Sequence, residues 1–426
     1  MANVLMLMLV SQTALSASSL AGQVQFVLSM IFYGLTGGTA IMTAQYWGKG
    51  DTRTIEKVMA IGVRMTFGIS LVFALAAWLA PDGLMMIFTD KPDLIAEGAR
   101  YLRAVAASYV LHGFCAISLG ARRSIERVGM SAAVHALAVA INVALNACFI
   151  FGWGPFPAMG IVGVALATSI TRAVEALICV LYNARLRVVR LRFNDMWGKF
   201  PVLRRDFLHY ALPSMGNDMV WGMAFTMYSV ILGHLSSDIV AANSLNTMIR
   251  NMATVVCFGC SSSAAVILGK TMGENRLDDA RVYAGRFVRM SIYTALAGGL
   301  VVLMLRPAIM SLSDLEAFRL TSEAKAYFST MLLITSYYII GQSVNTMLIC
   351  GVYRSGGDVR FGLLMDAVSM WCYAVPVGFI SAFVLKLPPM WVYFILCLDE
   401  FVKMPVAVRH YFGYKWLKNI TRSDMN

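Results

Sequence analysis

Asp218 is a carboxylate in an apolar stretch of the chain, PSMGNDMVWGMAFTMY, and an aromatic stripe follows it. Trp221, Phe225 and Tyr228 come at intervals of three or four residues, so a helix places them on the face that carries Asp218. A carboxylate beside three rings suits an organic cation, which it attracts by charge and by cation-π contact. In the alternative interpretation the rings only pack, and Asp218 bonds to a neighbouring helix.

Asp366, in the stretch LLMDAVSMW, is a second carboxylate among apolar residues. A carboxylate in such surroundings can take up and release H+ or Na+ as its access to water changes. Coupling of transport to an ion gradient needs that exchange. The alternative is a carboxylate at a helix end that pairs with Arg360.

Two stripes of uncharged polar side chains accompany these carboxylates. Asn142 and Asn146 stand one helical turn apart, and the second stripe consists of Tyr338, Gln342 and Asn345. Amides can bind Na+ or a ligand, but they cannot carry a proton. The alternative is that both stripes only join helices through hydrogen bonds.

Two pairs of opposite charge have the spacing of structural ion pairs. Arg172 and Glu175 are three residues apart, and so are Glu400 and Lys403. Side chains at this spacing meet on one helix face. We therefore expect an ion pair near the cytoplasmic end of each of these helices.

The elements that carry these residues are predicted to be membrane-spanning helices. The chain is 59% hydrophobic and 14% charged, with a mean hydropathy of +0.69, which is more apolar surface than one water-soluble core can bury. Apolar runs long enough to cross a hydrocarbon layer of ~30 Å recur along it. We predict full spans at residues 19–47, 58–80, 101–121, 130–152, 159–183, 207–235, 239–269, 284–305, 327–351, 361–385 and 390–412. The fold class is therefore an all-α membrane protein.

The net charge of +12 indicates orientation in the membrane, because the basic residues gather in alternate loops. These loops contain residues 49–57, 122–127, 185–205, 270–281, 354–360 and 415–422. The positive-inside rule places them and the C-terminus in the cytoplasm. We expect a multi-pass monomer of the cell (plasma) membrane, whose partners are the lipid bilayer and a small-molecule substrate and not nucleic acid.

The chain also resembles itself. Ser19, Gly34 and Gly48 recur 225 positions later as Ser244, Gly259 and Gly273. A second set of matches, 231 positions apart, pairs Gly120, Arg123 and Pro157 with Gly351, Arg354 and Pro388. Two pseudo-symmetric six-helix bundles follow, at 1–183 and at 207–426 with its short basic tail, joined by a basic cytoplasmic linker at 184–206. Parallel repeats of this kind occur in transporters.

The repeat predicts that the first helix is incomplete. Residues 1–15 are apolar but too short to cross a membrane, and they lack the pattern of a signal peptide. The seventh helix begins near Asp206, so its counterpart would begin before Met1. We expect either a start codon upstream or a truncated copy.

The sequence lacks the residue patterns that metal binding, phosphate binding and enzyme catalysis need. The eight cysteines fall inside predicted spans, and the pair Cys257 and Cys260 has no partner set that would complete a metal site. No glycine-rich phosphate loop and no convergent catalytic set is present. We expect no enzyme activity, no cofactor and no resident metal, with Na+ at most a transient ligand.

Four ordered motifs make the chain similar to a known family. They are TAQYWGKGD at 43–51, ARRSIERVG at 121–129, GVALATSITRAVE at 163–175 and GVYRSGGD at 351–358. In this order and spacing they resemble the multidrug and toxic compound extrusion (MATE) transporters, over nearly the whole chain. The resemblance implies two six-helix bundles around a V-shaped cavity, and export of drugs or metabolites driven by inward H+ or Na+.

The resemblance also implies site residues. Asn217, Asp218 and Trp221 match a stretch in which related members carry an acidic residue and a tryptophan. The cation site of the family's N-terminal half corresponds here to Asn142, Asn146 and Thr168. Related members often have aspartate at the positions of Asn146 and Asn3, whereas this chain has amides. We therefore expect ion coupling to use Asp218 and Asp366 in the C-terminal half.

The expected function is secondary antiport: export of small organic molecules, cationic or amphipathic, in exchange for H+ or Na+ by alternating access. One alternative is a flippase of lipid-linked cargo, which would need a cavity lined by cations. A second alternative is a membrane receptor or enzyme that transports nothing.

Overall fold

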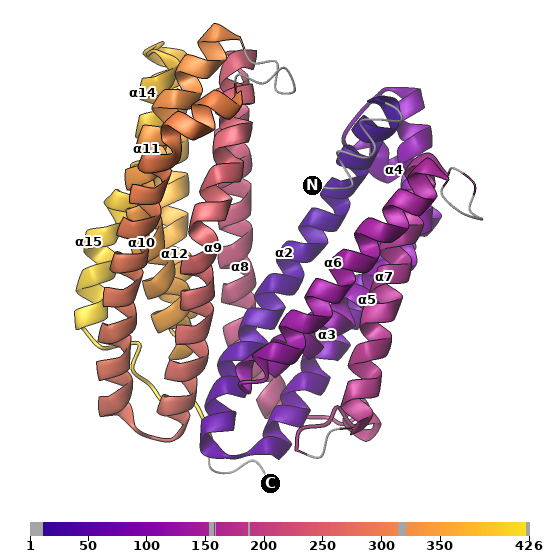
Figure 1. Cartoon of the computed structure of the whole chain (residues 1–426). Helices are drawn as coiled ribbons and strands as arrows, with labels where there is room; N and C mark the ends of the chain where they lie inside the picture. The colour runs from indigo at the N-terminus through magenta and orange to yellow at the C-terminus, as the bar shows by residue number, and fades with distance from the viewer. Residues whose placement is uncertain (1–11, 153–156, 158, 186–187, 314–320, 423–426) are drawn as a thin grey trace. The chain divides into compact units, whose positions relative to one another are not determined.

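The computed structural model describes residues 12–152, 157, 159–185, 188–313 and 321–422. Within these ranges the chain is helical and contains no strand, as Figure 1 shows. Helices dominate because a backbone in hydrocarbon must satisfy its own hydrogen bonds, which a helix does locally. The predicted all-α fold is confirmed. Of the short segment expected at residues 1–15, residues 1–11 with Asn3 lie outside the described residues, and residues 12–15 belong to helix α2 (Gln12–Lys49).

The chain divides into two compact units, and the second includes a short stretch from the first half of the sequence. The first comprises residues up to Thr43 together with Gly50–Met215, and the second comprises Ala44–Lys49 and Gly216–Asn426. The stretch expected to be a linker, 184–206, belongs to the first unit. There Asp195 forms a bidentate ion pair with Arg53, at 2.5 and 2.6 Å.

The first unit contains most of the helices from the first half of the chain. They are α2 (Gln12–Lys49, up to Thr43), α3 (Thr52–Leu79), α4 (Pro81–Met86), α5 (Pro92–Ser124), α6 (Val128–Phe151), α7 (Gly160–Arg185), a short 3-10 turn η1 (Phe193–Met196) and the start of α8 (Pro201–Gly233). Helix α5 packs between α3 and α7, and α6 packs on α7. The core contains Leu28, Phe32, Leu102 and Tyr109.

The second unit is built from the rest of α8 and the helices that follow. They are α9 (Ser237–Gly273), α10 (Leu277–Ser313), α11 (Ser322–Thr346), η2 (Met347–Tyr353), α12 (Val359–Asp366), η3 (Ala367–Ala374), α13 (Val375–Phe379), η4 (Ile380–Val384), α14 (Pro389–Leu396) and α15 (Asp399–Phe412). Helices α9, α10 and α11 pack against one another, and α15 lies on α11. The segments η2, η3 and η4 are π-helical, a form often found near functional sites.

Nine helices in the described part of the chain are long and apolar enough to cross a membrane, and they match nine of the predicted spans. The span predicted at 207–235 lies in the continuous helix α8, which is not among the nine. Large apolar side chains such as Trp78, Leu79 and Met304 are more than 60% exposed on the outside of these helices. In water this surface would be unfavourable, so these side chains are suited to contact with lipid.

The span predicted at 390–412 is not one continuous helix. Helix α14 ends at Leu396 and α15 begins at Asp399. At the break, the backbone N–H of Glu400 donates to the Asp399 carboxylate at 2.8 Å. A side-chain acceptor thus competes with the carbonyl of the regular helix, which interrupts the backbone ladder.

Candidate functional site

Asp218 is paired with an arginine inside the second unit. The Arg354 guanidinium donates to Asp218 Oδ1 at 3.0 Å, and more weakly to Asn217 Oδ1 at 3.4 Å. Both charged side chains are largely buried, with 22% of Asp218 and 15% of Arg354 exposed. Because a guanidinium stays charged at any physiological pH, Asp218 has a permanent counter-ion. This is the bond to a neighbouring helix that the alternative interpretation expected.

Asp366 is also paired, and its partner is Lys403 rather than Arg360. The Lys403 ammonium donates to Asp366 Oδ1 at 2.9 Å, and the Asn217 amide donates to Oδ2 at 2.6 Å. All three side chains are buried. Asn217 therefore connects the Asp218 pair on one side to the Asp366 pair on the other.

Lys403 serves a second carboxylate, that of Glu400, at 3.1 Å. The ion pair predicted from their spacing is present, and both of its side chains are buried. Glu400 is 1% exposed and Lys403 is 3% exposed. Asn345 of α11 donates to both the carbonyl and the carboxylate of Glu400, at 2.6 and 2.8 Å. These contacts hold α11 and α15 together in the interior of the unit.

Asp399 is the fully buried acid at the start of α15. Its Oδ2 accepts a hydrogen bond from the Tyr228 hydroxyl at 2.9 Å, and its Oδ1 accepts from the Glu400 N–H. No lysine, arginine or histidine in the described part of the chain lies within ion-pair distance of it. Asp399 therefore has hydrogen-bond donors but no counter-ion in contact.

These residues form one hydrogen-bonded set, which we call the charged cluster: Asp218, Arg354, Asp366, Lys403, Asp399 and Glu400, bridged by Asn217. It contains four carboxylates and two cations. Burial of an uncompensated charge costs several kcal/mol, on the order of 2.5–3.5 for an acidic group at the centre of a membrane helix. The cluster therefore carries more negative than positive charge, so an added cation would be favourable. Among the described residues, Asp399 is the acid of the cluster that contacts no counter-ion.

The aromatic stripe predicted on α8 is present. The ring centroids of Trp221 and Phe225 lie 4.6 Å apart, and those of Phe225 and Tyr228 lie 5.5 Å apart. Gln342 of α11 is buried, and its side-chain oxygen accepts no hydrogen bond from the described residues. Of the predicted site residues, Asp218 and Asp366 belong to the charged cluster, Asn217 bridges it, and Tyr228 and Asn345 donate hydrogen bonds to it. In the described part of the chain no hydrogen bond joins the cluster to Trp221 or Gln342.

The polar residues predicted in the first unit make a smaller group. The Asn146 amide donates to Asn142 Oδ1 at 2.9 Å, and the Asn142 amide approaches the Thr171 hydroxyl at 3.5 Å. Thr168 is separate, because its hydroxyl donates to the carbonyl of Val164 in its own helix. Uncharged amides of this kind can join helices or bind a ligand, and they do not carry a proton.

The second ion pair predicted from spacing, in the first unit, is also present. Arg172 donates to Glu175 at 2.6 Å, and His135 Nδ1 lies 3.3 Å from the same carboxylate. The Glu175 side chain is completely buried. Its carboxylate therefore has a permanent counter-ion, in contrast to Asp399.

Four members of the charged cluster were absent from the predicted site: Arg354, Lys403, Asp399 and Glu400. The signal that could have revealed the last two is an acidic pair, LDEF, in the middle of the apolar run 390–412. Among the described residues, no group of three or more histidine, cysteine, aspartate or glutamate side chains could hold a metal ion. The free cysteines Cys257 and Cys260 do not form such a group.

The sequence matches known proteins over most of its length. The family model described as MatE matches residues 1–148 and 213–380. The probable multidrug resistance protein NorM of Bradyrhizobium diazoefficiens is 26% identical over 386 residues, which cover 87% of this chain and 80% of that protein. The uncharacterized transporter YisQ of Bacillus subtilis is 23% identical over 98% of this chain and 90% of that protein.

Solved structures share the fold. The outward-facing conformation of a multidrug resistance MATE family transporter of the MOP superfamily matches with a TM-score of 0.86 and 17% identity, covering 97% of this chain and 91% of that chain. MATE in its bent conformation matches with a TM-score of 0.87, again at 17% identity, covering 97% and 90%. The family match spans both halves of the sequence, and the chain therefore belongs to the MATE family of membrane transporters.

Proposed function

We propose that this transporter exports small organic molecules from the cell in exchange for inward-moving H+ or Na+. The relatives named as multidrug resistance proteins support drug or metabolite export. The observation that supports ion coupling is the charged cluster, in which three buried carboxylates and the partly buried Asp218 share two cations, and in the described part of the chain Asp399 contacts no counter-ion. Intramembrane acids of this kind mark ion pathways in membrane proteins.

In this mechanism Asp399 and Glu400 hold the coupling ion. A bound H+ or Na+ offsets the surplus negative charge, and its release restores that charge. Asp218 and Asp366, which the sequence favoured for this role, position the neighbouring groups through Arg354 and Lys403. The Tyr228 hydroxyl, which contacts Asp399, connects the ion to the aromatic stripe of α8. Alternating access then moves ion and cargo in opposite directions.

The driving force is sufficient for export. One charge that crosses the membrane potential contributes about 2.3 kcal/mol per 100 mV, and the ion's concentration ratio adds to this. We place the transporter in the cell membrane with its C-terminus in the cytoplasm, because the basic loops alternate with neutral or mixed ones. An inward ion gradient then drives cargo outward.

The proposal is tested with the full chain in proteoliposomes and two fluorescent cargoes of opposite charge, ethidium and carboxyfluorescein. A pH gradient or a Na+ gradient is imposed separately, and dye movement is followed. We expect at least one dye to accumulate against its own concentration gradient. This accumulation should occur only when an H+ or Na+ gradient drives the ion in the opposite direction. Dye movement that is independent of both the H+ and the Na+ gradient would exclude antiport.

A further inference from the structure

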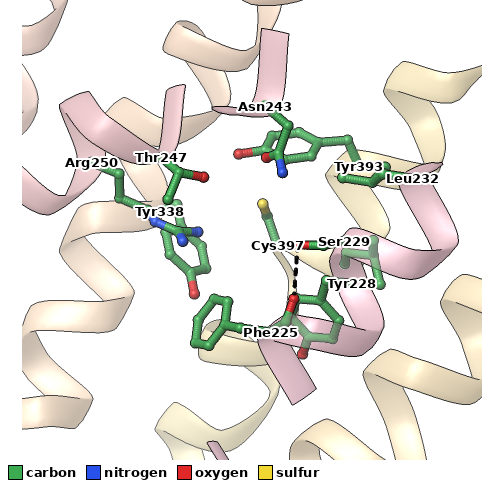
Figure 2. A pocket seen from close by; sticks show the side chains of 11 residues that line it. Phe225, Tyr228, Ser229, Leu232, Asn243, Thr247, Arg250, Tyr338, Tyr393 and Cys397 are labelled. Carbon is green, nitrogen blue, oxygen red and sulfur yellow. Dashed lines mark hydrogen bonds between the residues drawn. The ribbon is translucent and has the colours of Figure 1, made fainter. Parts of the chain in front are cut away.

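The second unit contains a cavity that lies beside the charged cluster and has a chemistry of its own. Its volume is about 100 Å³, and helices α8, α9, α11 and α14 line it. Figure 2 shows the lining side chains, with Phe225 and Tyr228 on one side and Arg250 next to Tyr338. Asp399 does not line the cavity, but Tyr228 does, and the hydroxyl of Tyr228 donates to the Asp399 carboxylate.

Arg250 is a charged residue inside a candidate membrane span. Asn243, Thr247 and Arg250 follow one another at intervals of four and three residues, so α9 presents all three to the cavity. Within the described part of the chain, the guanidinium makes no hydrogen bond and no ion pair. Its N–H donors, which form a planar fork, therefore remain available to a ligand.

The two aromatic rings beside Arg250 already have a cation. The guanidinium carbon lies 4.9 Å from the centre of the Phe225 ring and 5.6 Å from that of the Tyr338 ring. The protein itself thus supplies the cation-π contact that the α8 stripe was expected to offer a cationic substrate. A positively charged ligand placed here would be repelled by Arg250, and an anionic one would be attracted.

A second group in the cavity also lacks a partner. Tyr338 is 2% exposed, and among the described residues its hydroxyl has no hydrogen-bond partner. A buried hydroxyl without a partner is unfavourable unless a ligand or water satisfies it. An acceptor oxygen that meets the Arg250 fork could also accept from this hydroxyl.

From this geometry we infer that the cavity binds the carboxylate group of an organic anion. Arg250 contacts both carboxylate oxygens, because its planar fork matches their geometry, and Tyr338 donates to one of them. The apolar body of the ligand lies against Phe225, Leu232 and Leu396, which line the same cavity. If this ligand is the cargo, the inference rests on the proposed export function. The inference also replaces the expectation of a cationic substrate at the aromatic stripe of α8.

Equilibrium binding tests the inference without any ion gradient, so its outcome is independent of the dye-exchange assay. The full chain in lipid nanodiscs is titrated at neutral pH with indole-3-propionate and with tryptamine, which share a ring and a side-chain length but differ in charge. We expect the anion to bind at least tenfold more tightly than the cation. Equal or tighter binding of tryptamine, or no binding of indole-3-propionate, would overturn the inference.

Variants assign the binding to the two residues. Arg250→Gln should weaken indole-3-propionate binding at least tenfold, and Tyr338→Phe, which keeps the ring against Arg250, should weaken it severalfold. The matched control is Arg289→Gln, an exposed arginine of α10 that bonds to the carbonyl of Gly285 and should bind as wild type does. If Tyr338→Phe and a folded Arg250→Gln both bind the anion as wild type does, the site is not here.

Discussion

Lys403 is the main cation that compensates the buried carboxylates of the second unit. Its ammonium contacts Asp366 at 2.9 Å and Glu400 at 3.1 Å, and all three side chains are buried. Asp399 lies four residues before it without contacting it. One ammonium thus serves two carboxylates, and among the described residues a third acid nearby, Asp399, has only hydrogen-bond donors. This local imbalance is the physical basis of the proposed ion coupling.

Removal of the Lys403 charge should destabilise the protein. Lys403→Gln leaves two buried carboxylates without a cation, and loss of one partner of a buried pair costs about 3–5 kcal/mol. We expect a clearly lower melting temperature for the purified protein. Arg409→Gln, at an exposed position of the same helix, is the control and should melt like wild type. Equal melting of Lys403→Gln and wild type would show that Lys403 does not compensate the acids.

At the scale of elements, the internal repeat has a structural reason. Gly48 at the end of α2 and Gly273 at the end of α9 are 225 positions apart, and the two helix ends meet in the second unit. A Cβ at Gly48 would overlap the carbonyl oxygen of Lys270, and a Cβ at Gly273 would overlap that of Gln45. Equivalent glycines therefore let each helix approach the backbone of the other.

Alanine at either glycine should force these helix ends apart. Overpacking of this kind costs about 1–3 kcal/mol, so Gly48→Ala and Gly273→Ala should each lower the melting temperature. Gly259→Ala is the matched control on α9, where a Cβ would meet no atom within 4 Å. Because alanine favours helices, this control should be neutral or slightly stabilising. A Gly273→Ala protein as stable as the control would contradict the close approach.

The sequence was sufficient to predict the helices and the local pairs, but not the distant ones. Hydropathy located nine spans, and the three-residue spacing found Arg172 with Glu175. The partner of Asp218 is Arg354, which lies 136 positions away. No local pattern relates residues at such separations, so only the packing of helices identifies Arg354 as the counter-ion of Asp218 and Lys403 as that of Asp366. Arg250 could have been noticed as a charged residue inside the predicted span 239–269, but only the packing of helices shows which side chains surround it.

At the scale of the whole molecule, the distribution of basic loops predicts the orientation. A reporter that is active only in the cytoplasm should work when fused after the C-terminus. The same reporter inserted after Leu235, in the neutral segment between α8 and α9, should be inactive. Both reporters are measured in intact cells. The reverse pattern of activities would mean that the chain has the opposite orientation and that the assigned direction of transport is wrong.

The central claim is that the acid without a counter-ion, Asp399, handles the coupling ion. The most direct measurement is ion-driven dye accumulation by Asp399→Asn in proteoliposomes, beside wild type and the surface variant Asp279→Asn. Asparagine keeps the size of the side chain and one acceptor oxygen but removes its charge. We predict that Asp279→Asn accumulates dye as wild type does and that Asp399→Asn loses accumulation at least tenfold while remaining folded. Accumulation by Asp399→Asn at the wild-type level, under the same H+ or Na+ gradient, would contradict the account.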